Sequence, residues 1–358
     1  MKARDLLVPA YALGVFGALL QITGGVWDVS AHILGLVETF FTPSHLVLYA
    51  GIALVLLAVV VGVYVRFRGL SRGATDRFLL TGLLIALVGG GLQVAAGPFD
   101  SWWHATYGFD AFLFTPPHSL LVVGIALTGI GMGVGAVRLL QAHRAGVDLG
   151  AFRISRRGLH VLAVMGLTTL WLGLNGLVYL LTDTGGIAYT FGFGEPFLAQ
   201  AGLPAFILGT SFLGLTGTLV FLSAKRILGW RGGATAVALL GAVIIATLSL
   251  GFRAANDPAN GGAIAAFIPL YLAFLLPVAL FDVLVRDLRS WRVTLLAAVL
   301  LAPFASFLDG FYSAGLWTEG PQFIPFLLVP IFLMGLVAGL TQLRFSESLL
   351  SRAMASAA

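Results

Sequence analysis

Long apolar runs recur along the whole chain, and their length constrains the fold more than any other feature of the sequence. An α-helix of roughly 20 predominantly apolar residues crosses the hydrocarbon core of a bilayer. About ten runs meet this requirement: 7–27, 45–65, 78–97, 118–140, 159–181, 203–224, 234–252, 262–285, 293–310 and 323–343. Backbone groups inside a bilayer must be satisfied within their own segment, so these runs are predicted to be helices. The predicted fold class is therefore all-α, in a polytopic membrane protein.

The composition excludes a soluble globular protein and several kinds of site. Apolar residues make up 59% of the chain and charged residues 10%, whereas soluble domains carry about 25% charged residues. The mean hydropathy is +1.00. The chain contains no cysteine, which excludes a thiolate zinc site, an iron–sulfur cluster, a c-type haem attachment and a structural disulfide. The first apolar run is too long for the apolar core of a signal peptide and is predicted to be a retained helix.

The distribution of positive charge predicts the orientation in the membrane. Apart from Arg253, every Lys and Arg lies before the first run or at and after the ends of the even-numbered runs. Basic residues favour the cytoplasmic side, so both chain ends are predicted to be cytoplasmic in a protein of the cell membrane. These basic segments would face anionic lipid. Basic and aromatic residues are not interleaved along the chain, so the sequence does not indicate a nucleic-acid partner.

The runs are predicted to form five helical hairpins, of which the first two are repeats. Residues 17–38 match residues 89–110 at an offset of 72, and residues 41–54 match residues 114–127 at an offset of 73. A polar link joins this part to the rest of the chain. We therefore predict a four-helix module over residues 1–146, which carries the repeats, and a six-helix module of unknown role over residues 147–358.

Each repeat contains one aspartate and two histidines at matching positions, and together they use four of the six histidines in the chain. Residues four apart share one face of a helix, so the aspartate and the first histidine can address one ion. The second histidine follows a Thr-Pro pair, which is typical of a helix start, and a short turn would fold its helix back. Each set is predicted to be a metal site at the outer side of the membrane. The first triad is Asp28, His32 and His45, and the second triad is Asp100, His104 and His118.

The residue types alone leave the metal and its use open. Two histidines and one carboxylate suit copper, zinc or iron, and the remaining positions are open to water, O2 or substrate. A transporter would show ligands along a path through the bilayer, whereas here they cluster at one side. Transport is therefore disfavoured, while non-catalytic binding or sensing is not. The repeated motif is also compatible with helix capping and interfacial anchoring.

Further polar residues are candidates to support the ligands by hydrogen bonds, as the groups behind a metal ligand commonly do. Gln21 and Gln93 each precede an aspartate of a triad, and their alternative role is to join helices. Glu38 and Asp110 follow the first histidine of each triad in equivalent positions. The remaining histidines, at 143 and 160, fall at the inner side and are predicted to be structural or solvent-exposed.

At these positions the sequence resembles the C subunit of the copper membrane monooxygenases, the particulate methane and ammonia monooxygenases. That family carries a copper site with Asp-x3-His-x12-His spacing, within a stretch similar to Phe-Thr-Pro-Ser-His at 41–45, and the first triad has this spacing. A neighbouring site of the family has Asn-x3-His-x13-His spacing, which the second triad matches except that Asp100 stands in place of the Asn. The resemblance covers about residues 15–130.

The resemblance implies copper at both triads and O2-dependent hydroxylation of a small apolar substrate. It also implies partners similar to the A and B subunits of that family, since no segment here is long and polar enough to form their soluble copper-binding domain; a homo-oligomer is the alternative. Two other functions stay open. One is a non-catalytic copper or zinc binding, sensing or transport protein, and the other is a structural subunit whose motif is a relic. Whether the chain is an enzyme is not decided by its sequence.

Overall fold

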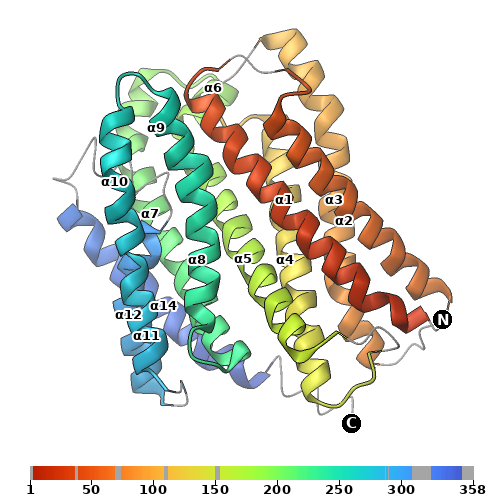
Figure 1. Cartoon of the computed structure of the whole chain (residues 1–358). Helices are drawn as coiled ribbons and strands as arrows, with labels where there is room; N and C mark the ends of the chain where they lie inside the picture. Colours follow the sequence, from red (N-terminus) through yellow and green to blue (C-terminus); the bar gives the residue numbers. More distant parts are fainter. Residues whose placement is uncertain are drawn as a thin grey trace.

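The structure, a computed structural model, describes residues 3–36, 39–68, 74–108, 112–149, 154–286, 288, 290–308 and 324–348. Within these ranges the chain forms helices joined by turns and irregular segments, with no strand. Figure 1 shows long helices running side by side as one bundle. The all-α prediction is confirmed.

The first part of the chain forms mainly long helices, and shorter helical elements lie between long helices α7 and α14. They are η1 (Ala3–Leu6), α1 (Leu7–Ile33), α2 (Pro43–Arg68), α3 (Ala74–Tyr107), α4 (Pro116–Arg144), α5 (Arg156–Thr182), α6 (Thr184–Phe191), α7 (Glu195–Leu228), α8 (Gly233–Ile245), η2 (Ala246–Gly251), α9 (Phe252–Asn256), α10 (Gly261–Ala273), α11 (Leu275–Leu284), α12 (Trp291–Phe307) and α14 (Ile324–Ser348).

Nine helical segments in the described part of the chain are long and apolar enough to cross a membrane. They correspond to nine of the predicted runs. The remaining run, 293–310, forms the shorter apolar helix α12, which has 17 residues. The prediction of a multi-pass membrane protein therefore agrees with the length and the composition of these helices.

Two of the spanning segments are not regular α-helices. The stretch η2 between α8 and α9 is π-helical, a geometry that is frequent at functional sites. The next segment is interrupted at Phe274, between α10 and α11. Pro277 accounts for this interruption, because it has no N–H to donate to the carbonyl of Ala273, where α10 ends.

The helix pairs α1–α2 and α3–α4 pack closely through equivalent glycines. A Cβ atom on Gly17 would lie 2.8 Å from the carbonyl oxygen of Gly51, and one on Gly89 would lie 2.6 Å from that of Gly124. Neither distance tolerates a side chain, so glycine lets the two backbones approach. The same contact thus occurs in both halves of the sequence repeat.

Gln21 and Gln93 are buried in the same region and join three helices. Thr128 Oγ1 donates a hydrogen bond to Gln21 Oε1 at 2.7 Å. Gln93 Nε2 lies 3.4 Å from both Gln21 Oε1 and Thr128 Oγ1. These hydrogen bonds connect α1, α3 and α4, which is the helix-joining role open to the two glutamines. None of the hydrogen bonds described for them reaches an aspartate of a triad.

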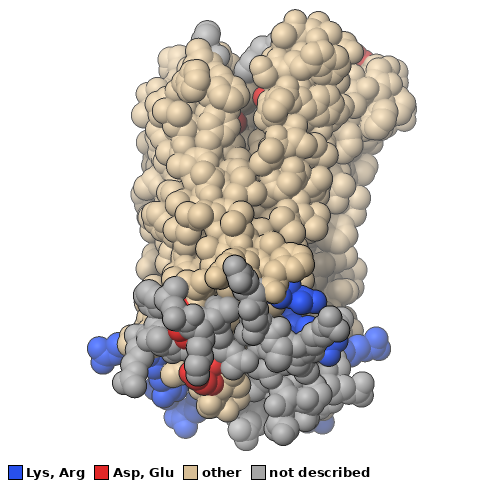
Figure 2. Space-filling model, turned by 90° about the vertical axis from the view of Figure 1, so that its right-hand side faces the viewer, with Lys and Arg blue, Asp and Glu red and all other residues tan. Residues whose placement is uncertain are grey.

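Charged side chains are unevenly distributed along the bundle. Figure 2 shows Lys and Arg at the lower end of the molecule with some Asp or Glu beside them, and further Asp or Glu in a notch between two lobes at the upper end. Some of the basic side chains bind backbone carbonyl groups. Arg144 Nη2 donates to Leu228 O at 2.7 Å, at the C-terminus of α7, and Arg226 Nη1 donates to Gln342 O at 2.9 Å, within α14. A cation at a helix C-terminus is favourable because it opposes the helix dipole.

A buried ion pair connects three helices of the second half of the chain. Lys225 Nζ, near the end of α7, lies 2.9 Å from Asp282 Oδ1 on α11. The other oxygen, Asp282 Oδ2, accepts from Thr235 N at 3.0 Å and from Thr235 Oγ1 at 3.2 Å, at the start of α8. Both carboxylate oxygens of this fully buried residue are therefore satisfied.

Candidate metal centre

The second triad is positioned by the end of one helix and the start of the next. Asp100 and His104 lie one turn apart near the C-terminal end of α3, and His118 lies in the first turn of α4. Thr115 is the N-cap residue of α4, as predicted, but its hydroxyl makes no capping hydrogen bond. One of the two N–H groups that a cap usually binds belongs to the second helical residue, which here is Pro117 and has none.

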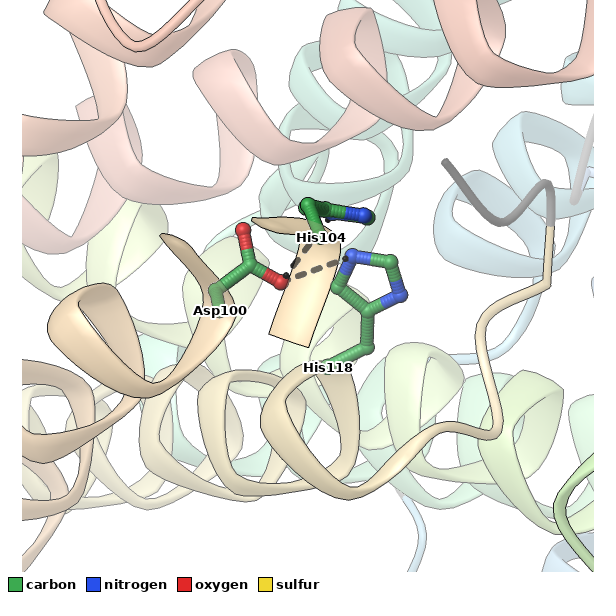
Figure 3. Close-up of side chains that lie close together, drawn as sticks. All are labelled: Asp100, His104 and His118. Carbon is green, nitrogen blue, oxygen red and sulfur yellow. Dashed lines mark ion pairs between the residues drawn. The ribbon is translucent and has the colours of Figure 1, made fainter. Parts of the chain in front are cut away.

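The ligand atoms of the second triad converge (Figure 3). Asp100 Oδ1 lies 3.5 Å from His104 Nε2 and 3.3 Å from His118 Nε2, and one ligand atom from each residue lies within 4.8 Å of the others. Ligand atoms about 2.1 Å from a common tetrahedral ion lie roughly 3.4 Å apart. In the described part of the chain, no other group of three such side chains meets the 4.8 Å distance.

Both histidines of the second triad present the same ring nitrogen to Asp100. His118 Nδ1 lies 2.8 Å from the carbonyl oxygen of Phe112, and His104 Nδ1 lies 3.1 Å from that of Gly108. A carbonyl only accepts, so each Nδ1 carries the proton and donates it, which leaves the lone pair of the neutral ring on Nε2. Metal-binding histidines are commonly held by such a hydrogen bond from the other nitrogen.

Asp100 Oδ1 is buried, and no described residue donates a hydrogen bond to it. A buried carboxylate oxygen without a donor is costly, and a bound cation would satisfy it. The equivalent oxygen of the first triad, Asp28 Oδ1, accepts a hydrogen bond from Ser44 Oγ at 3.0 Å. In the second repeat the position of Ser44 is taken by Pro117, which has no donor. The residues of the second triad therefore fit a metal ion.

The first triad has a different geometry. His45 Nε2 lies 2.8 Å from Asp28 Oδ1, and His45 Nδ1 lies 2.8 Å from the carbonyl oxygen of Thr39. His32 is turned the other way, with Nδ1 3.0 Å from the carbonyl oxygen of Asp28 and 3.8 Å from its Oδ2. Asp28 thus contacts both histidines, but the three residues do not bring their ligand atoms within 4.8 Å of one another. A shared ion here requires the ring of His32 to rotate.

The two triads lie side by side. The rings of His32 and His118 are arranged edge to face with centroids 5.7 Å apart. The rings of His104 and His118 have centroids 5.8 Å apart. His118 is therefore flanked by one histidine from each repeat.

A cavity of about 440 Å³ lies against these histidines. Helices α1, α4, α5 and α7 and the π-helical stretch η2 contribute to its walls, and its lining is mainly apolar. The polar residues that line it include Asp28, His32, His118, Asn175 and Ser249. A mainly apolar cavity with a few polar groups is the usual form of a site for a small molecule.

Asp183 is a residue whose contribution to the site the sequence did not reveal. Its Oδ2 accepts from the backbone N–H groups of Leu113 at 2.7 Å and Phe114 at 2.9 Å, while its Oδ1 caps the first turn of α6. The carbonyl of Phe112, which orients His118, belongs to the same segment. The sequence around Asp183 is typical of a helix cap, but nothing in it indicates the long-range partner.

Asp183→Asn is expected to weaken metal binding at the second triad by roughly ten-fold, as removal of groups behind a metal ligand commonly does. The amide keeps the size of the side chain but loses the charge that strengthens its hydrogen bonds to the segment before α4. Titration of metal-free protein with Cu(II) measures the effect. Asp257→Asn is the matched control, because the hydrogen bonds of Asp257 stay within its own turn. Equal affinities in the two variants would contradict this role of Asp183.

The remaining candidates do not join the site in the described residues. Glu38 and Asp110 lie outside the residues that the structure describes. His143 is exposed, and His160 lies at the opposite end of α5 from the cavity residue Tyr179, with its Nδ1 2.7 Å from the carbonyl oxygen of Arg156. No protein-family model, curated protein or solved structure matches this chain.

Proposed function

We propose that this chain is an integral membrane copper protein in which each triad binds one copper ion. The observation that carries the proposal is the convergence of the second triad, whose separations of 3.3 Å and 3.5 Å are those of ligands around one ion. Asp100 Oδ1, which is buried and accepts no hydrogen bond from a described residue, also supports it. The proposed ligands are Asp28, His32 and His45 for one ion, and Asp100, His104 and His118 for the other.

Copper is proposed before zinc and iron for two reasons. Sites built from nitrogen and oxygen ligands bind Cu(II) more tightly than the other first-row divalent ions. The spacing of both triads also resembles that of the copper sites of the membrane monooxygenases. Three protein ligands leave positions open at the ion, as a catalytic site requires and a structural zinc site does not.

The proposed reaction is O2-dependent hydroxylation of a small apolar molecule held in the cavity. One oxygen atom enters a C–H bond and the other is reduced to water, which consumes two electrons and two protons from an external donor. Bound copper would supply the activation of O2. The chain's own residues hold the ion, orient its imidazole ligands and place an apolar cavity against His32 and His118.

The reaction needs electrons from outside the chain. We propose that partner subunits deliver them, and that these subunits are similar to the A and B subunits of the membrane monooxygenases. A homo-oligomer is the alternative assembly. Non-catalytic binding of copper or zinc is the second candidate function. At the first triad Asp28 already accepts from Ser44 and contacts His45, which favours the structural role of the motif there.

The purified protein, reconstituted with Cu(II), is expected to hold about one to two copper ions per chain and to prefer copper to zinc in competition. Metal analysis measures the content, and electron paramagnetic resonance should show nitrogen ligands. A content below roughly 0.2 ion per chain would overturn the metal proposal, because two histidines and a carboxylate should bind the Cu(II) supplied during reconstitution. Copper binding without substrate-dependent O2 consumption, in the presence of partners and donor, would favour the non-catalytic function.

We also propose that the protein lies in the cytoplasmic membrane with both chain ends inside and the triads toward the outer face. The gathering of Lys and Arg at one end of the bundle supports this orientation. Reporter fusions at residues 70 and 148 are expected to be cytoplasmic, and fusions near residues 190 and 256 are expected to be outside. A fusion at residue 148 that reports the outer side would contradict the orientation.

A further inference from the structure

We propose that the cavity beside the triads binds a hydrocarbon group of roughly 10 to 18 carbon atoms, and that residues after the repeats, within 147–358, set this size. The inference deepens the proposed function by naming the class of substrate, and it rests on that function only for the chemistry that would follow binding. The hydrocarbon is either a free molecule or the acyl chain of a lipid, which share the same recognition chemistry.

The volume of the cavity indicates the size of the ligand. An apolar protein cavity of about 150 Å³ holds one benzene molecule, with six carbon atoms. The cavity here has a volume of about 440 Å³, roughly three times larger. At the same degree of filling it accommodates about 18 carbon atoms. A one-carbon molecule or ammonia would leave most of this space unfilled.

The polar groups in the walls are largely engaged with the protein, so they do not select a polar ligand. Thr216 Oγ1 donates to Asn175 Oδ1 at 2.9 Å, and Ser30 Oγ donates to the carbonyl of Val26 at 2.7 Å. The oxygens of Asp183 accept from backbone N–H groups, as described above. A ligand in this cavity is therefore recognised mainly by burial of apolar surface and by shape.

Three glycines keep the cavity open, one on each of three helices. Gly25 on α1, Gly176 on α5 and Gly202 on α7 all line it. A Cβ atom on Gly25 or Gly176 would meet one side-chain atom, at 3.8 Å and 3.6 Å respectively, and one on Gly202 would meet nothing within 4 Å. Larger side chains thus fit at these positions and would occupy the cavity. Because α5 and α7 lie after the repeats, within residues 147–358, that part of the chain sets the depth of the cavity.

The test is photolabelling of metal-free protein in lipid nanodiscs with a 12-carbon alkyl diazirine. Light releases N2 and leaves a carbene that inserts into nearby bonds, and mass spectrometry maps the labelled peptides. Label is expected in residues 22–33 of α1 and 172–179 of α5, and unlabelled dodecane is expected to prevent it. Hexane, which fills a smaller part of the cavity, is expected to compete more weakly than dodecane.

Gly176→Leu and Gly202→Leu are expected to lower the specific labelling at least about five-fold, because a leucine side chain fills space that the ligand needs. Gly91→Leu is the matched control. A Cβ atom on Gly91 also meets nothing within 4 Å, Gly91 is exposed on α3, and it does not line the cavity. All three substitutions replace glycine inside a helix, so their effects on helix propensity are similar.

Specific labelling that survives both cavity substitutions, or that falls equally with Gly91→Leu, would overturn the inference. Because the protein is metal-free, the result does not depend on the metal proposal. Cavity labelling without copper binding would support the inference and contradict the proposed function, and copper binding without cavity labelling would do the reverse.

Mass spectrometry of lipids retained by the purified protein separates the two sources of the hydrocarbon. An acyl lipid that co-purifies and is displaced by dodecane identifies the lipid source, and its absence identifies the free hydrocarbon.

Discussion

His118→Ala is expected to abolish metal binding at the second triad and to remove one copper ion per chain. His118 supplies one of three ligand atoms, with its Nε2 3.3 Å from Asp100 Oδ1. The loss in affinity should exceed the roughly 10- to 100-fold that follows removal of groups behind a ligand. His104→Ala should have the same effect, because its Nε2 points to the same oxygen at 3.5 Å. Calorimetric titration of metal-free protein with Cu(II), together with metal analysis, measures the change.

His143→Ala is the matched control for this experiment. His143 is exposed near the end of α4 that lies away from the triads, so its removal leaves both sites intact. Variants of the first triad provide a second comparison. If His32→Ala removes one ion and His118→Ala removes another, the triads bind independently. Unchanged copper content in both His104→Ala and His118→Ala would show that the ligand assignment is wrong.

Asp282→Ala is expected to destabilise the protein by about 3–5 kcal/mol, the cost of removing one partner from a buried ion pair. The substitution leaves the buried ammonium of Lys225 without its carboxylate and leaves the donors of Thr235 at the start of α8 without their acceptor. The free energy of unfolding can be measured in mixed micelles by titration with a denaturing detergent. Asp257→Ala, at a partly exposed carboxylate whose hydrogen bonds stay within its own turn, is the control and should cost much less stability.

The double variant Lys225→Met/Asp282→Leu distinguishes the cost of an unpaired charge from the loss of the pair itself. Apolar side chains of similar size often replace a buried ion pair without loss of stability. We therefore expect the double variant to recover most of what Asp282→Ala loses. A double variant that is as unstable as the single one would show that the pair contributes through its geometry and not only by neutralising charge.

Much of the helical architecture follows from the sequence. Apolar runs of membrane-spanning length lie in helices of the structure, because the bilayer leaves the backbone no other partner than itself. The irregular segments were not predicted. The interruption at Phe274 follows from Pro277, which removes one hydrogen bond, but nothing in the run 234–252 distinguishes the π-helical stretch from a regular helix. Such departures depend on the neighbours against which a helix packs.

The sequence by itself also determined which residues are candidates for metal binding, because i,i+4 spacing and a helix start after Thr-Pro are local properties. It did not distinguish the two triads, whose ligand types are the same. Only the tertiary structure decided that Asp100 converges with two Nε2 atoms while Asp28 is already paired with Ser44 and His45. Only the tertiary structure shows that Asp183 binds the segment that orients His118, and that α5 and α7 form part of the cavity walls. These contacts join residues far apart in the chain, and their geometry depends on how helices pack, which a local pattern does not encode.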